Sequence, residues 1–232
     1  MRILADGSCS APLEPSPVGM ASLVELLGDA RRRGFLGPGP VERQLAHAER
    51  FADLIGDPPS SFLDLGSGGG LPGLVLAQRW HRPGVLLDAN ERRCDWLDEA
   101  LQRLGAAERV AVRCGRAEVL ARDLDLREAF ALVSARSFGP PPATAECGVG
   151  FLAPGGALIV SEPPEGGAPP DARWPAAALR ELGLEGPETH RVGDVGIAVL
   201  RRVGPLATRW PRRTGVPTKR PLWTLAEELP AH

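Results

Sequence analysis

The sequence has few of the features that mark metal-binding, disulfide-linked or membrane-spanning proteins. Its four cysteines are scattered, with no Cys-x-x-Cys pair and no histidine at metal-ligand spacing, so neither a zinc site nor a disulfide framework is indicated. No stretch approaches the roughly 18 uncharged apolar residues of a membrane span, and the first residues lack the pattern of a signal peptide. We therefore expect a soluble, cytoplasmic protein with no metal cofactor and no membrane partner.

Lysine is also nearly absent, since Lys219 is the only one in 232 residues. Arginine carries the remaining positive charge, and its excess alongside Ala, Gly and Pro indicates a GC-rich coding sequence more than a functional demand. The net charge of −2 at pH 7 gives no support for a nucleic-acid partner over the whole chain. A local basic patch does exist near the C-terminus, where seven basic residues and no acidic one lie between Arg201 and Arg220.

The length and apolar content suit one α/β domain with extensions. Strand-like and helix-like apolar patterns alternate, which is typical of a mostly parallel, Rossmann-like sheet with crossover helices. We expect strands over residues 61–65, 84–88, 110–113, 130–135 and 157–161, and helices over 71–80, 91–104, 117–123 and after Pro142. A tight turn at 152–156, a loop at 163–175 and closing antiparallel strands at 190–191 and 196–202 complete this domain, residues 58–203.

Three further segments flank the domain. Residues 1–19 are rich in Pro, Ser and Gly and are expected to be disordered. Residues 20–57 are expected to form a helical cap, with helices over 20–33 and 41–55. Residues 204–232 are expected to form a basic C-terminal tail.

A buried strand that runs straight into a glycine-rich turn, residues 62–73, is the most informative stretch of the chain. In an open parallel sheet, ligands bind at the carboxyl ends of the strands, where the first such turn offers backbone N–H groups. The spacing differs from the dinucleotide fingerprint and looks like the first motif of class I S-adenosylmethionine (SAM) methyltransferases. A structural glycine turn in another Rossmann-like protein is the alternative. The candidate cofactor residues here are Asp64, Gly66, Gly68, Gly70 and Leu71.

Asp88 ends the second expected strand, 18 residues after Gly70. An acidic side chain at this point can accept hydrogen bonds from both ribose hydroxyls of an adenosine, and it would repel a 2′-phosphate. The same residue type could instead cap the following helix. The two roles are compatible.

Two further positions follow the third and fourth expected strands. Ala117 and Glu118 occupy the place where class I methyltransferases hold the adenine. Arg136 follows the fourth strand, as a candidate for orienting cofactor or substrate or as an ordinary surface arginine. No Asn-Pro-Pro-Tyr-like motif follows that strand, which disfavours methylation of the exocyclic amine of adenine.

With these positions in place, the chain resembles the RsmG (GidB) family of bacterial 16S ribosomal RNA guanine-N7 methyltransferases. Three segments carry the resemblance: DLGSGGGLPGLVLA at 64–77, ARSF at 135–138 and RWPRRTGVPTKRPL at 209–222. It implies SAM as cofactor and ribosomal RNA or the small ribosomal subunit as partner. In the third segment, basic side chains would neutralise phosphates while Trp210 stacks on a base. The candidate RNA-binding residues are Arg209, Arg212, Arg213, Lys219 and Arg220.

The chain departs from the family pattern at residues 44–50, where an Arg-His pair is usual, and at Glu162-Pro163, where Lys-Gly is usual. These departures leave two alternatives open: a divergent paralogue that methylates a small molecule or another RNA, and a non-catalytic SAM- or RNA-binding protein. Guanine N7 carries a free lone pair and needs no general base, so no catalytic residue is assigned. A hydroxyl or protonated amine would need a base. The candidates for it are His47, Glu118 and His190.

Overall fold

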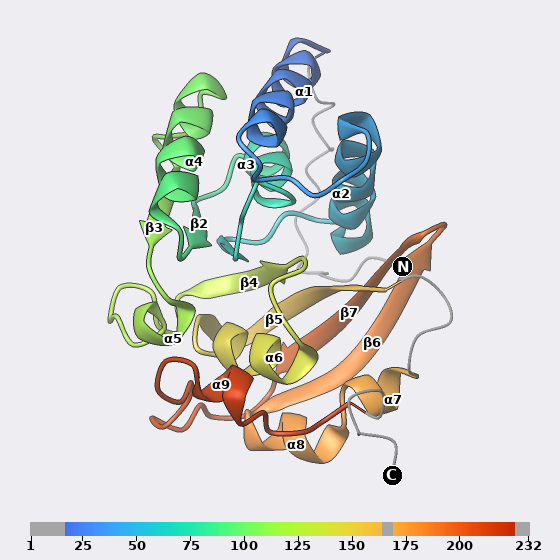
Figure 1. The fold of residues 1–232 in the computed structure, drawn as a ribbon. Coiled ribbons are helices and arrows are strands. Elements are labelled where there is room, and N and C mark those ends of the chain that lie inside the picture. Colours follow the sequence, from blue (N-terminus) through green and yellow to red (C-terminus); the bar gives the residue numbers. More distant parts are fainter. Residues whose placement is uncertain (1–16, 164–168, 226–232) are drawn as a thin grey trace. The chain divides into compact units, whose positions relative to one another are not determined.

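The computed structural model describes residues 17–163 and 169–225, which belong to two compact units divided after Gly115 (Figure 1). Most of the N-terminal segment expected to be disordered lies outside the described residues. Within the described ranges, no helix is long and apolar enough to cross a membrane. The same residues contain no group of three or more His, Cys, Asp or Glu side chains placed to hold a metal ion.

The described part of the first unit, residues 17–115, contains four helices and three parallel strands. Strand β2 pairs with β1 on one side and with β3 on the other, and β1 and β2 are buried throughout, as expected for continuous apolar runs in a parallel sheet. In chain order the elements are α1 (Pro17–Arg32), α2 (Val41–Ile55), β1 (Phe62–Leu65), α3 (Gly73–Trp80), β2 (Gly84–Asp88), α4 (Glu91–Arg103) and β3 (Val110–Cys114).

Helices α2 and α4 show how the sequence sets these elements. Helix α2 buries Leu45, Ala48 and Ile55, whose spacing places them on one face. Helix α4 begins at an N-cap, Asn90, whose side chain accepts a hydrogen bond from the backbone N–H of Arg93 at 3.2 Å. Helix α2 has the predicted range, whereas α1 begins at Pro17, three residues before the predicted start and within the segment expected to be disordered.

The second unit contains the other four strands in the order β4, β5, β7, β6. Strands β4 and β5 are parallel, whereas β7 pairs antiparallel with both β5 and β6, which confirms the expected closing strands over longer ranges. The elements are α5 (Ala117–Leu120), β4 (Phe130–Ala135), α6 (Pro141–Val149), β5 (Leu152–Glu162), α7 (Pro170–Arg173), α8 (Ala176–Glu181), β6 (Leu184–Val192), β7 (Val195–Arg202) and α9 (Val216–Lys219).

The expected tight turn at 152–156 is instead the first part of β5. Phe130 pairs with Leu152 and Leu132 with Ala157, so the four residues 153–156 of β5 lie opposite the single residue Ala131 of β4 in an irregular bulge. Gly155 has φ 78°, a conformation that favours glycine. The expected loop at 163–175 also contains a short helix, α7.

Candidate cofactor site and basic C-terminal segment

The glycine-rich turn joins β1 to α3 and has the predicted backbone conformation. Gly66, Gly68 and Gly70 have φ values of 71°, 55° and 91°. Ser67, which the sequence did not single out, fixes the turn: its backbone N–H donates to Leu87 O at 2.9 Å and its hydroxyl donates to Asp64 O at 3.0 Å. The turn is therefore held against the ends of both β1 and β2.

Asp64 acts within the protein framework of this turn. Its side chain is buried, and Oδ2 accepts a hydrogen bond from the backbone N–H of Gly73 at 3.1 Å. That bond satisfies an N–H at the start of α3, which has no partner inside its own helix. Leu71 is also buried. The structure thus places both residues where they shape the turn.

Asp88 lies at the end of β2, only 5% exposed, and joins the turn to α4. Its Oδ2 accepts from the backbone N–H of Gly68 at 2.8 Å, and its Oδ1 accepts from the backbone N–H of Asn90 at 2.9 Å. Arg93 Nη1 lies 3.7 Å from Oδ2. A carboxylate oxygen has two lone pairs, so each oxygen retains capacity to accept a ligand hydroxyl.

The residues of the turn fit an adenosine-containing cofactor. A methyl group built on Gly68 would meet only Gly66 O, at 3.8 Å, so the protein leaves open space beside this glycine. The buried Asp88 carboxylate is bonded to the same residue. Open backbone next to a buried, ionisable acceptor is what recognition of ribose hydroxyls requires.

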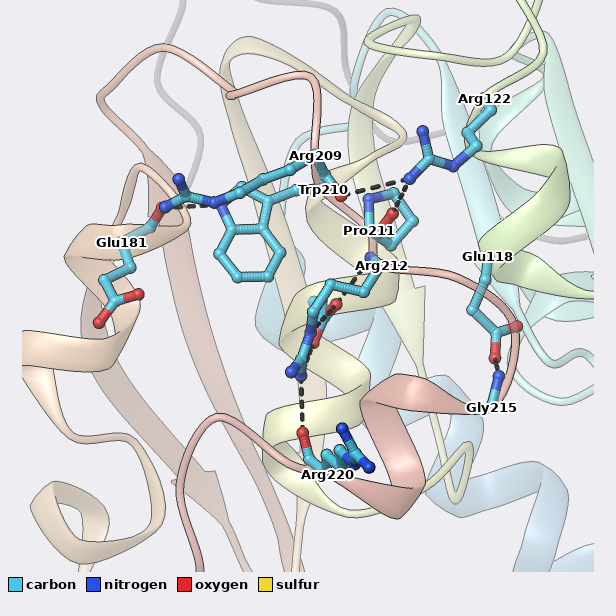
Figure 2. Close-up of polar contacts among 10 residues, drawn as sticks. Glu118, Arg122, Glu181, Arg209, Trp210, Pro211, Arg212, Gly215 and Arg220 are labelled. Carbon is cyan, nitrogen blue, oxygen red and sulfur yellow. Dashed lines mark hydrogen bonds and ion pairs between the residues drawn. The ribbon is translucent and has the colours of Figure 1, made fainter.

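Glu118, the residue expected near the adenine, accepts a hydrogen bond from the C-terminal segment of the second unit (Figure 2). Its Oε1 accepts from the backbone N–H of Gly215 at 2.9 Å and from Arg116 Nη2 at 3.0 Å. Burial alone would raise the pKa of Glu118, but these hydrogen bonds outweigh burial and lower the pKa. Ala117 is buried beside it, and Arg136 is half-buried after β4.

The basic C-terminal residues 204–223, which we call the strap, are bound to the rest of the second unit by hydrogen bonds and an ion pair. The main partner is Glu146 of α6, whose side chain is 0% exposed. Its carboxylate accepts three hydrogen bonds from Arg212: from the backbone N–H at 2.8 Å, from Nε at 2.8 Å and from Nη2 at 2.6 Å. These bonds raise the pKa of Arg212. Arg212 is therefore a structural anchor.

Trp210 is buried as well, at 3% exposure, so the expectation that it stacks on a base is wrong. Its Nε1 donates to Glu181 O at 3.0 Å, and the guanidinium of Arg209 lies 4.8 Å from its ring centre (Figure 2). Backbone carbonyls of this stretch accept from Arg122 and Arg127. The hydrogen bond of the indole and its contact with a guanidinium are thus both made within the protein.

Four basic residues of the strap remain exposed. Within residues 17–163 and 169–225, no carboxylate forms an ion pair with any of them. They are Arg209, Arg213, Lys219 and Arg220. These four and Arg212 were the candidate RNA-binding residues. In the structure Arg212 is bound to a buried carboxylate, whereas the other four are exposed.

Glu162, which stands where the family pattern was expected to have lysine, has its carboxylate paired within the protein. Glu162 Oε2 accepts from Arg173 Nε at 2.8 Å, and Oε1 accepts from Trp174 Nε1 at 2.9 Å. The two candidate bases His47 and His190 lie in different units, on α2 and β6.

The alternating elements, the closing antiparallel pair and the glycine turn beside Asp88 define a class I SAM-dependent methyltransferase. Solved structures of this fold are similar to the chain. An O-methyltransferase from Bacillus cereus in complex with SAH has a TM-score of 0.56 at 16% identity, covering 78% of this chain and 90% of the other. An RNA methyltransferase from Salinibacter ruber in complex with S-adenosyl-L-homocysteine has a TM-score of 0.51 at 18% identity, covering 74% and 97%.

Sequence relatives identify the family. The family model described as rRNA small subunit methyltransferase G matches residues 41–161. The protein named ribosomal RNA small subunit methyltransferase G of Symbiobacterium thermophilum is 30% identical over 95% of this chain and 97% of its own length. That of Kineococcus radiotolerans is 34% identical over 87% and 82%. The chain belongs to this family and is an enzyme that uses SAM.

Proposed function

We propose that this enzyme methylates N7 of a guanine in the RNA of the small ribosomal subunit, in the cytoplasm. The observation that carries the proposal is the strap. Two buried carboxylates, Glu146 and Glu118, accept hydrogen bonds from it, while four of its cations are exposed and form no ion pair within residues 17–163 and 169–225. Fixed guanidinium and ammonium groups on such a segment suit an RNA backbone. Membership of a family named for ribosomal RNA methylation supports the same substrate.

We assign cofactor binding chiefly to the open backbone at Gly68 and to Asp88. Gly66 and Gly70 shape the turn, while Asp64 and Leu71 support it from the interior. Ala117 remains the proposed neighbour of the adenine. Glu118 acts through its bond to the strap.

The proposed chemistry needs alignment more than acid–base catalysis. SAM supplies an electrophilic methyl group on a sulfonium. In the transfer, the N7–carbon bond forms as the sulfur–carbon bond breaks, the electron pair stays on sulfur, and the positive charge passes to the purine. No proton leaves N7, so the chain has to hold the two reactants in line and exclude water. Arg136, half-buried after β4, is the proposed orienting residue for the guanine or its phosphate.

Transfer of a tritium-labelled methyl group from SAM tests the proposal. We expect label in 16S RNA when small ribosomal subunits are the substrate, and release of labelled 7-methylguanine after depurination. Naked RNA, large subunits and a protein-free small-molecule extract serve as parallel substrates. Labelling of the small-molecule fraction alone would favour the divergent paralogue. Cofactor binding without label in any fraction would favour the non-catalytic alternative, and either outcome would contradict our proposal.

A further inference from the structure

The loop between α1 and α2, residues 33–40, packs directly against the cofactor turn. A methyl group built on Gly69 would lie 2.5 Å from Leu36 Cδ2 and 2.8 Å from Phe35 O. Both distances are shorter than carbon atoms tolerate, and one of the obstructing atoms is backbone. The absence of a side chain at Gly69 is therefore what allows the loop to approach this closely.

Few of the loop's own side chains can hold it in place, since its sequence is Arg-Gly-Phe-Leu-Gly-Pro-Gly-Pro. At the start of the loop Arg33 pairs with Asp29 and Glu99, but further along, side chains of the flanking helices supply the hydrogen bonds. Gln44 Nε2 of α2 donates to Gly37 O at 2.9 Å and to Pro38 O at 3.3 Å. Arg31 of α1 donates to Gly39 O. The middle of the loop thus depends on an amide donor from α2.

Trp96 of α4 connects the loop and the turn a second time. The ring of Phe35 meets Trp96 edge to face, with centroids 6.2 Å apart. A methyl group built on Gly70 would lie 3.3 Å from Trp96 Cη2, so the same indole also contacts the turn. Trp96 is fully buried. The loop, the turn and α4 are consequently packed together around the Trp96 indole.

We propose that Gln44 is a positioning residue for SAM binding: it holds the 33–40 loop on Gly69 and thereby keeps the glycine turn in its binding conformation. The inference rests on the assignment of the cofactor to that turn. It extends the site beyond the residues assigned to cofactor or RNA binding.

The physical reason is preorganisation. A loop with three glycines has high backbone entropy when nothing holds it in place. A ligand that binds only when the loop is ordered then loses binding free energy to that ordering. In the intact protein, folding has already ordered the loop. Loss of the Gln44 donor should therefore weaken cofactor binding and leave the chemical step unchanged once cofactor saturates the enzyme.

Three substitutions at Gln44 separate the hydrogen bonds from the packing. Gln44→Glu keeps the shape but replaces the donor with an acceptor that faces two carbonyls, so we expect S-adenosylhomocysteine to bind about tenfold more weakly by calorimetry. Gln44→Ala should show a smaller loss, and Gln44→Lys, which restores a donor, should recover most of the affinity. Gln102→Glu, at an exposed position of α4, is the matched control and should leave affinity unchanged.

A kinetic measurement distinguishes positioning from general damage. For Gln44→Glu we expect a higher KM for SAM, an unchanged KM for RNA and an unchanged kcat. Equal S-adenosylhomocysteine affinities for wild type and Gln44→Glu would overturn the inference, as would a fall in kcat with no change in KM for SAM. Gly69→Ala, which pushes on the loop from the turn, should weaken the same affinity even if a Gln44 variant folds poorly.

The calorimetry also separates this inference from the proposed function. If the wild type binds S-adenosylhomocysteine and the Gln44 series behaves as expected, the inference holds whichever RNA is methylated. If Asp88→Ala leaves the affinity intact, the assignment of the cofactor to this turn fails, and the inference fails with it.

Discussion

At the scale of single residues, Asp88 has an observed place in the framework and a proposed one in cofactor binding. Its two carboxylate oxygens each accept one backbone N–H, from Gly68 and Asn90, before any ligand arrives. The side chain is thereby held in one orientation at little entropic cost to binding. In the proposed site, the same carboxylate that links the turn to α4 would present its remaining lone pairs to a ribose.

Replacement of Asp88 tests that double role. We expect Asp88→Ala to weaken S-adenosylhomocysteine binding by about 1–3 kcal/mol, because the ribose hydroxyls lose their acceptors. Isothermal titration calorimetry measures the change, and Asp95→Asn, at an exposed position of α4, is the control. An unchanged affinity would reduce Asp88 to a structural link between turn and helix.

The pair formed by Arg212 and Glu146 shows that an arginine in a basic segment can be the partner of a buried carboxylate. Arg212→Ala would remove the two side-chain donors, Nε and Nη2, and leave the buried Glu146 carboxylate with the backbone N–H of residue 212 alone, so we expect a loss of about 3 kcal/mol or more in the free energy of unfolding. The double variant Glu146→Leu/Arg212→Met should lose less than the single one, because no buried charge remains. Urea unfolding of the two variants decides this, and a greater loss in the double variant would contradict it.

Among the structural elements, the strap carries the most specific expectation about RNA. Replacing its four exposed cations together, as Arg209→Gln/Arg213→Gln/Lys219→Gln/Arg220→Gln, should weaken RNA binding. Each lost phosphate contact should flatten the salt dependence by about 0.7 in logarithmic slope. Affinity for S-adenosylhomocysteine should stay the same. Filter binding at several salt concentrations measures the slope.

A matched charge change at Arg82, Arg92, Arg103 and Arg180 controls for net charge, since these arginines are exposed outside the strap. An equal loss of slope in this control would show that the strap has no special part in holding RNA.

At the level of elements, the sequence predicted well wherever a local pattern decides the structure. The ranges of α2, β2 and β4 agree with the observed ones to the residue, because each has a clear apolar pattern and, for α2, Pro40 and Gly56 also mark the two ends. It failed at the start of β5, where Leu-Ala-Pro-Gly-Gly has the composition of a turn. Pairing with β4 through a bulge overrides that local preference.

The site was predictable only as far as the residues act locally. The conformation of the glycine turn and the place of Asp88 at the end of β2 were predicted from spacing along one strand–helix–strand unit. The roles of Arg212 and Trp210 were not, because their partners lie far along the chain: Glu146 is 66 residues from Arg212, and Glu181 is 29 residues from Trp210. Nothing in the composition of a basic segment tells which of its cations meets a buried carboxylate.

For the molecule as a whole, the strap belongs to the folded second unit rather than to a dispensable tail. Truncation after Val203 would remove the donors to Glu118 and Glu146, the buried ring of Trp210 and the contact of Trp223 with Trp174. We therefore expect the truncated chain to unfold at a lower urea concentration than Arg212→Ala. Equal stability of truncated and full-length chains would contradict this, and RNA binding is better tested by charge substitution than by truncation.

The scarcity of lysine gives the strap an experimental use. Lys219 is the chain's only lysine and is exposed on α9, so apart from the amino terminus it is the one primary amine available for acylation. An amine-reactive fluorophore would therefore label the strap without any engineered residue. Protection of that amine by bound ribosomal subunits would give a footprint of the proposed contact, read by mass spectrometry on the unaltered protein.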